Sequence, residues 1–107
     1  MSVALLIKEV DGKPTKGYYP VSVQSYFDDV WMKVSEENDF EWIPLFQTGF
    51  PFTEEDLPYI LDELYQFEKA CEKEYDKEEE EYLFRRIALL KEHLEPLRGK
   101  QCKFFIG

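Results

Sequence analysis

From Ser22 onward, apolar side chains recur at helical spacing. Intervals of three and four residues place them on one face, while Asp28, Asp29, Lys33 and Glu36 occupy the other. This spacing predicts an amphipathic helix over Val23–Glu37. Its apolar positions are Val23, Phe27, Val30, Trp31 and Val34.

Two more helical stripes occur in the second half of the chain. The first consists of Leu57, Ile60, Leu61, Leu64, either Phe67 or Glu68, and Cys71, and the second of Leu83, Ile87, Leu90, Leu94 and Leu97. No aliphatic side chain lies between residues 72 and 81, and Asp76 followed by Glu79 can cap a new helix. We therefore favour an antiparallel helix pair over one uninterrupted helix across residues 58–97.

Strand patterns lie at both ends of the chain. Ser2–Val10 contains the unbroken apolar run VALLI, which predicts a central strand buried on both faces. The segment QCKFFIG has the β propensity of a final strand that pairs with it. Between the first strand and the first helix, DGKPTKG predicts a turn, and YYPV is either a short return strand or a loop, because Pro20 is excluded from a central position.

The segment DFEWIPLFQTGFPF combines five aromatic residues with two prolines. Its FEWIPLF part predicts a short edge strand or an extended segment, since Pro44 cannot donate to a ladder. The helix that follows has two possible starts. Thr53 can be its N-cap, with Asp56 completing a capping box, or Pro58 can occupy the first helical position after a separate acidic turn.

These elements predict one α+β domain over residues 1–107, in which a small sheet of the N- and C-terminal strands packs with about three helices. The chain is 44% hydrophobic and 17% aromatic, which excludes the class of disordered chains. It has neither an apolar run long enough to span a bilayer nor a visible secretory signal, so we expect a cytoplasmic location. Cys71 and Cys102 are then expected to be reduced thiols.

The formal charge of −10 is concentrated in one part of the chain. Residues 53–81 contain thirteen carboxylates and three lysines, a net charge of −10, whereas residues 82–107 have a net charge of +4. Such a field repels nucleic acid and anionic membranes and attracts basic proteins. We therefore expect a basic protein partner and no binding to nucleic acid or membranes.

Motifs for catalysis or cofactor binding are not found. His93 is the only histidine, the five glycines form no phosphate-binding loop, and two distant cysteines do not make a zinc site. Carboxylate pairs such as Asp28 with Asp29 arise by chance in a chain with 23 acids. The expectation is a protein without enzymatic activity, cofactor or metal.

Aromatic side chains next to carboxylates have the composition of a protein-binding hot spot. We expect the apolar anchor of such a site to come from Trp42, Phe50 or Phe52. The accompanying charges would steer the partner and pair with its lysines and arginines. They are Glu54, Glu55, Asp56, Asp62 and Glu63.

The stretch EWIPLFQTGFPFTEEDLPYILDEL, which runs from an aromatic segment through a Gly turn into an acidic helix, resembles the immunity proteins of bacterial polymorphic toxin systems. The resemblance covers residues 40–64. It implies a non-enzymatic protein that neutralises one cognate toxin, often a basic nuclease, by docking on or near its active site.

Two other interpretations remain open at this level. A regulatory or adaptor protein could self-associate or dock a partner through EYLFRRIALLKEHLEPL, and an enzyme or ligand-binding protein could use a pocket near Trp42. The chain itself could be a monomer or a homodimer.

Overall fold

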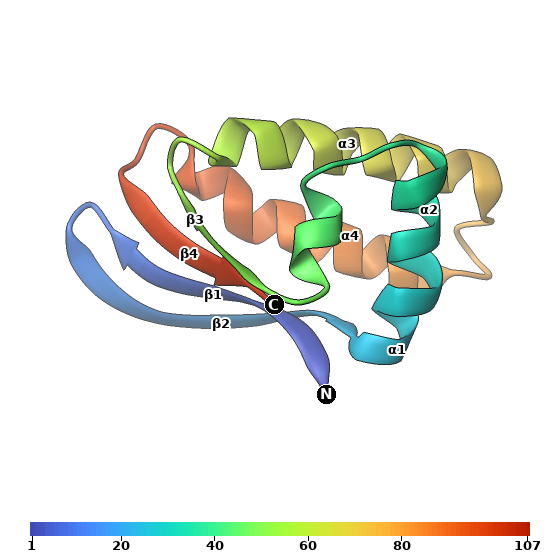
Figure 1. Cartoon of the computed structure of the whole chain (residues 1–107), viewed down its shortest axis with the longest axis horizontal. Coiled ribbons are helices and arrows are strands. Elements are labelled where there is room, and N and C mark those ends of the chain that lie inside the picture. The colour runs from blue at the N-terminus through green and yellow to red at the C-terminus, as the bar shows by residue number, and fades with distance from the viewer.

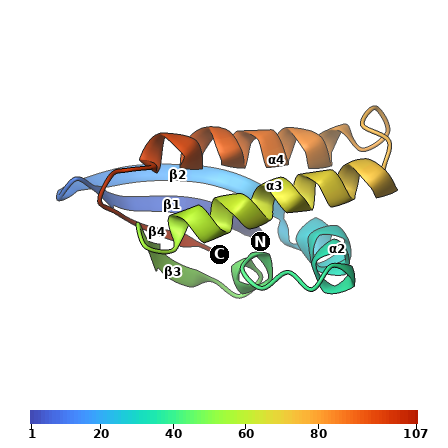
Figure 2. The same cartoon turned by 90° about the horizontal axis from the view of Figure 1, so that it is seen from above.

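A computed structural model describes residues 1–107 and shows an α+β fold, as predicted. Four strands form one antiparallel sheet in the order β2-β1-β4-β3. The strands are β1 (Ser2–Val10), β2 (Lys13–Val23), β3 (Phe50–Thr53) and β4 (Cys102–Ile106). The helices cover one face of this sheet (Figures 1 and 2). The pairing of the N-terminal strand with the C-terminal one is confirmed.

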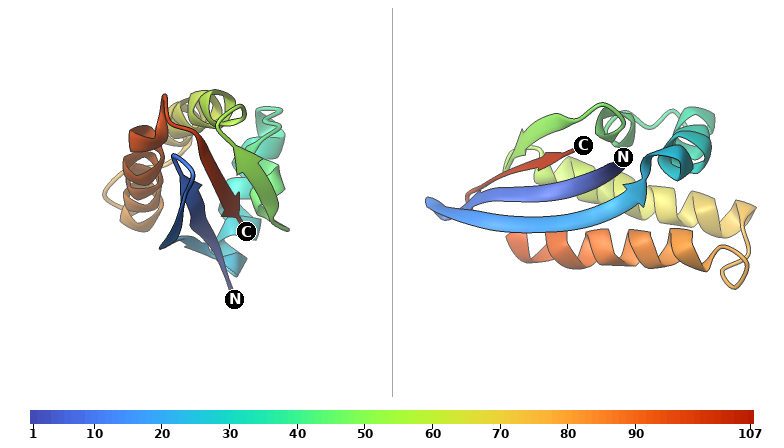
Figure 3. Two further views of the ribbon diagram at one scale, coloured as in Figure 1. Left: turned by 90° about the vertical axis from the view of Figure 1, so that its left-hand side faces the viewer. Right: turned by 90° about the horizontal axis from the view of Figure 1, so that it is seen from below.

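Strand β1 occupies a central position between β2 and β4, but the expected burial on both faces is wrong. Val3 and Leu5 are fully buried beneath the helices, whereas Leu6, on the opposite face, is partly exposed. Seen from below, no helix passes in front of the strands (Figure 3, right). An apolar run in a strand cannot by itself show whether both faces are covered, and here only one is.

The predicted DGKPTKG turn is limited to two residues, and the rest of that segment belongs to β2. Asp11 and Gly12 both have positive φ, 52° and 80°, the backbone of a tight two-residue hairpin turn. Pro14 and Pro20 lie in β2 because it is an edge strand, where a missing N–H need not break a ladder. Of the two readings of YYPV, the return strand is correct.

The first predicted helix is confirmed within one residue. It comprises α1 (Gln24–Tyr26), a π-helical turn η1 (Phe27–Trp31) and α2 (Met32–Glu37). Trp31 is fully buried and stacks on Phe67 of α3, with ring centroids 4.7 Å apart. It is therefore a core anchor, as the stripe predicts.

The FEWIPLF segment is not an edge strand. Residues Ile43–Phe46 form a 3₁₀ helix, η2, and the adjacent edge strand is β3. Pro44 is in the first turn of η2, where a helix lacks an acceptor for the missing N–H in any case. The short helix turns Ile43 and Phe46 into the core, and both are fully buried.

Two helices, α3 (Leu57–Glu74) and α4 (Glu81–Leu94), form the predicted antiparallel pair and are followed by a 3₁₀ turn η3 (Glu95–Leu97) (Figure 2). Helix α3 ends at Glu74 because the backbone of the next residue, Tyr75, is extended. The Asp76 carboxylate then accepts hydrogen bonds from the N–H groups of Glu78 and Glu79, at 2.8 and 3.2 Å. This local turn competes with helical continuation and explains the break without Gly or Pro.

The start of α3 combines both predicted alternatives. Thr53 ends β3, and its N–H donates to the Asp56 carboxylate at 3.0 Å, so the reciprocal bond of a capping box is present. The helix itself begins at Leu57, with Pro58 in its first turn. A separate acidic turn over residues 54–56 therefore precedes the helix, and Pro58 causes no conflict with a carbonyl one turn back.

Candidate functional site

Trp42 and Tyr59 form an aromatic pair at the surface. Trp42 immediately precedes η2 and is half-buried, while Tyr59, in the first turn of α3, is 63% exposed. Their rings stack at a centroid distance of 5.9 Å and an interplanar angle of 9°. Trp42 also approaches the buried Phe52, 6.2 Å away between centroids. Trp42 therefore connects the core to an exposed ring.

The two predicted phenylalanines differ in exposure. Phe52 is 2% exposed and packs against Phe46 and Phe104, so it is a core residue and not a surface anchor. Phe50, two residues earlier on the same side of β3, is 44% exposed and lies 5.3 Å from Phe52 between centroids. Phe50 and Trp42 thus keep surface that a partner can contact, and Phe52 supports them from below.

Glu63 is buried, and its carboxylate holds the backbone on both sides of Trp42. Its Oε1 accepts hydrogen bonds from the N–H groups of Trp42 and Ile43, both at 2.8 Å, and its Oε2 accepts one from Glu41 at 3.0 Å. These N–H groups open η2 and have no acceptor within that helix. The Glu63 carboxylate is therefore used inside the fold, as a cap for η2.

Two other predicted acids also serve the backbone. The Glu54 carboxylate accepts a hydrogen bond from the N–H of Cys102 at 2.9 Å and so connects the acidic turn to β4. Asp56 accepts the Thr53 N–H described above. Both side chains are half-buried. Their charge contributes to the local field, but each has a structural role in the turn before α3.

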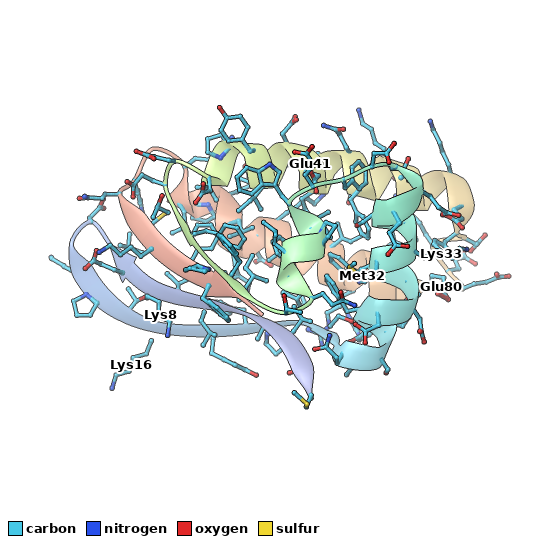
Figure 4. All side chains as sticks on the ribbon, in the orientation of Figure 1. Lys8, Lys16, Met32, Lys33, Glu41 and Glu80 are labelled. Atoms are coloured by element: carbon cyan, nitrogen blue, oxygen red, sulfur yellow. The ribbon has the colours of Figure 1, made fainter.

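Glu55 and Asp62 are the predicted acids that remain exposed, and Glu41 joins them. Asp62 accepts a hydrogen bond from the Gln66 side chain at 2.9 Å, and none of the three forms an ion pair within the chain. Glu41 lies beside α3 in Figure 4. These carboxylates are free to meet cations of another molecule.

We name the exposed residues of this region the aromatic-acidic patch. They come from β3, from the segment before η2, from the turn before α3 and from the first two turns of α3. The patch consists of Trp42, Phe50, Tyr59, Glu41, Glu55 and Asp62. Tyr59 and Glu41 were not predicted from the sequence. The available signal was that Tyr59 lies off the buried stripe of α3, between Pro58 and Ile60.

Most of the remaining acids of residues 53–81 lie toward the far end of α3 and in the α3–α4 connection. A helix of 18 residues is about 27 Å long, so Glu78 and Glu79 in the α3–α4 connection are well separated from the patch. At that far end Glu80 accepts a hydrogen bond from the Tyr26 hydroxyl at 3.0 Å. Burial and this carboxylate raise the pKa of Tyr26 above its ordinary value. The charge of the chain is thus divided between two places.

The leucine stripe of the last helix is part of the core. Leu83, Ile87, Leu90, Leu94 and Leu97 are each at most 5% exposed. Beside them, His93 is half-buried and stacks on Tyr19 of β2 at 3.7 Å between centroids. The stripe therefore has no free apolar surface with which to dock a second molecule.

Hollows in the surface lie away from the aromatic pair. The largest, about 560 Å³, lies between the start of α3 and the loop before β4 and is lined by Leu57, Pro58 and residues 97–101 together with Glu54. Trp42 lines none of the three hollows. No group of three or more His, Cys, Asp or Glu side chains is arranged to hold a metal ion. Neither α3 nor any shorter helix combines the length and apolar character needed to cross a bilayer.

Comparison of the chain with protein-family models, with curated proteins and with solved structures gives no match. Its function is therefore inferred from the chemistry of its own surface.

Proposed function

We propose that this chain is a non-enzymatic, acidic protein-binding domain of the immunity or inhibitor type, which neutralises a basic bacterial toxin by direct binding. The observation that carries the proposal is the exposed Tyr59 ring stacked on Trp42 beside carboxylates that have no cation within the chain. Aromatic residues at the centre of a charged rim are the usual composition of a binding hot spot.

The patch can recognise a basic protein in two ways. A lysine or arginine of the partner can lie over the Trp42 or Tyr59 ring, a cation–π contact that strengthens as water is excluded. Glu55 and Asp62 can pair with neighbouring cations, which raises the association rate and fixes the orientation of the partner. A toxin that acts on nucleic acid needs a basic cleft, and covering that cleft would block its substrate.

The support behind the patch favours tight binding. Glu63 fixes the backbone at Trp42 through three hydrogen bonds, and Phe52 fills the space beneath the indole. An anchor that is already held in place loses little conformational entropy when a partner binds. The patch is therefore organised before the encounter.

The test begins with capture of the partner from cells of the source organism, followed by titration of the purified captured protein. We expect a basic protein that arrests growth when produced alone and is neutralised by this chain. The double variant E55K/D62K should weaken binding by at least about tenfold and reduce its dependence on salt, since close charge pairs couple by about 1.5–7 kcal/mol.

The matched control is E78K/E79K, which makes the same change in net charge at the far end of α3. If both double variants weaken binding equally, only the overall field matters and the patch is not the binding site. Tyr59→Ala tests the aromatic anchor without changing charge. A captured partner that is acidic, or that binds all variants alike, would overturn the proposal.

Docking through the last helix, the second interpretation of the sequence, has less support. The apolar stripe that such docking requires is buried between α4, α3 and the sheet of the same chain. Any self-association would have to use another surface.

A further inference from the structure

The face of the sheet that lacks helices carries an apolar row across all four strands. Leu6 of β1 pairs with Tyr18 of β2 on one side and with Phe105 of β4 on the other, and Phe105 pairs with Pro51 of β3. Residues directly opposite in a sheet point to the same face. Tyr18 is 56% exposed and Pro51 is exposed, while Leu6 and Phe105 are half-buried.

Phe105 is held in this row by two glycines. A Cβ atom built on Gly49 would lie 2.5 Å from Cζ of Phe105, and one built on Gly107 would lie 2.9 Å from its Cε1. The ring therefore packs directly on the backbone of the loop before β3 and of the C-terminus. This close packing holds the ring in position, and Phe105 as a whole is half-buried.

Lysines border the apolar row at one end. By strand alternation Lys16 of β2 and Lys103 of β4 point to the same face as Tyr18 and Phe105. Lys8 lies at an irregularity of β1 between Ile7 and Glu9 and lines the same hollow as Lys103. In Figure 4, Lys8 and Lys16 lie on the side of the sheet away from the helices. The one acid beside them is Glu9, whose carboxylate lies 3.8 Å from the Lys103 ammonium, and Lys8 and Lys16 form no ion pair. This face is thus positive in a chain of net charge −10.

A hollow of about 400 Å³ lies where the apolar row meets the lysines. Its lining includes Pro51, Thr53 and Phe105 from the edge half of the sheet, with Lys8 and Lys103 beside them. An apolar side chain fits against Phe105 and Pro51 in such a hollow, and carboxylates next to it can reach the lysines. The lysines and the apolar hollow together therefore favour an acidic occupant that carries an apolar side chain.

We propose that this open sheet face docks a short acidic segment of another protein, in which an apolar residue is flanked by Asp or Glu. The surface is separate from the aromatic-acidic patch and opposite in charge. A nucleic acid is a poorer fit because three lysines neutralise few phosphates, while the field of the whole chain repels a long polyanion. The chain would thus hold a basic protein on one surface and an acidic segment on another.

The probe for this proposal is a fluorescein-labelled peptide in which Asp and Glu alternate with Leu and Phe, measured by fluorescence anisotropy. The double variant K8E/K103E should weaken peptide binding by at least about tenfold, the effect of one desolvated charge contact of about 1.4 kcal/mol. The control K69E/K73E changes the net charge equally on α3. A peptide with Gly in place of Leu and Phe should also bind at least about tenfold more weakly, since it has no apolar side chain to bury against Phe105 and Pro51.

A second measurement on the unmodified chain keeps the test valid if a variant fails to fold. Amide NMR shifts on addition of the peptide should cluster at Leu6, Tyr18, Lys103 and Phe105. Shifts elsewhere, no shifts at saturating peptide, or equal loss of binding in K69E/K73E would overturn the proposal. So would tighter binding of a single-stranded oligonucleotide of equal charge, or self-association in sedimentation that K8E/K103E abolishes, which would identify a second copy as the occupant.

Discussion

The carboxylate of Glu63 holds the backbone of Trp42, twenty-one residues away in the sequence, through a 2.8 Å hydrogen bond to its N–H. The same carboxylate accepts the N–H groups of Glu41 and Ile43. A residue of the acidic helix therefore acts as an internal cap, and the surface position of Trp42 depends on it. This relationship joins the stability of the fold to the geometry of the candidate site.

Replacing Glu63 by Ala should destabilise the protein by about 3 kcal/mol, because it removes the acceptor of three buried or half-buried N–H groups. Glu63→Gln keeps one oxygen as acceptor and should cost less, roughly 1 kcal/mol. Urea denaturation measures both changes. The control is Asp62→Ala at the exposed neighbouring position, which should stay within about 0.5 kcal/mol of the parent. Equal stability of the Glu63→Ala and Asp62→Ala variants would contradict the capping role.

Tyr59→Ala should make Trp42 more accessible to solvent at little cost in stability. The chain has two tryptophans, and Trp31 is fully buried, so quenching of fluorescence by acrylamide reports chiefly on Trp42. Loss of the stacked ring should raise the quenching constant by about twofold and lower the free energy of unfolding by roughly 1 kcal/mol. In the Trp42→Phe control, the remaining emission should be quenched weakly. Strong quenching in that control would mean that Trp31 is not shielded as described.

Gly49→Ala should destabilise the fold more than Gly99→Ala, although both glycines have positive φ, 97° and 76°. At Gly99 an added Cβ meets no atom within 4 Å, so only backbone strain of about 1–2 kcal/mol is expected. At Gly49 the same Cβ would also clash with the Phe105 ring, which adds about 1–3 kcal/mol. Thermal or urea denaturation of the two variants gives the comparison. Equal losses would show that Phe105 does not pack on Gly49.

Alkaline pH should destabilise the protein through Cys71. Burial raises the pKa of the Cys71 thiol to about 12, and the nearby Glu74, Glu68 and Glu72 carboxylates act in the same direction. Between the ordinary thiol pKa and this value the unfolded state loses a proton that the folded state keeps. The free energy of unfolding should therefore fall as pH rises through that window, by up to about 1.4 kcal/mol per pH unit from this group.

Cys71→Ala removes this titration, so urea denaturation under reducing conditions should show a weaker pH dependence for the variant above pH about 9. At neutral pH the thiol is protonated in both states and contributes no such dependence. Parallel curves for the two proteins across the alkaline range would mean that the buried thiol ionises without a folding penalty.

Much of the fold could be predicted from local patterns. Three helical segments could be predicted, because a 3.6-residue period sorts side chains onto one face whatever they pack against. Their apolar stripes are those of Phe27 and Trp31, of Leu57 to Cys71, and of Leu83 to Leu97. The N- and C-terminal strands and the break at Asp76 likewise depend on neighbours in the sequence. The segment around Pro44 was wrongly predicted, because its conformation depends on a carboxylate twenty residues later.

The candidate site could be predicted only in part, because the exposure of its residues depends on contacts between residues distant in the sequence. Its composition, aromatic residues next to acids, is visible in the sequence. The tertiary structure decided that Phe52 and Glu63 turn inward, that Glu54 and Asp56 serve the backbone, and that Tyr59 stacks on Trp42 at the surface. Whether a side chain is exposed depends on which other residues cover it, and only the folded chain determines which residues these are.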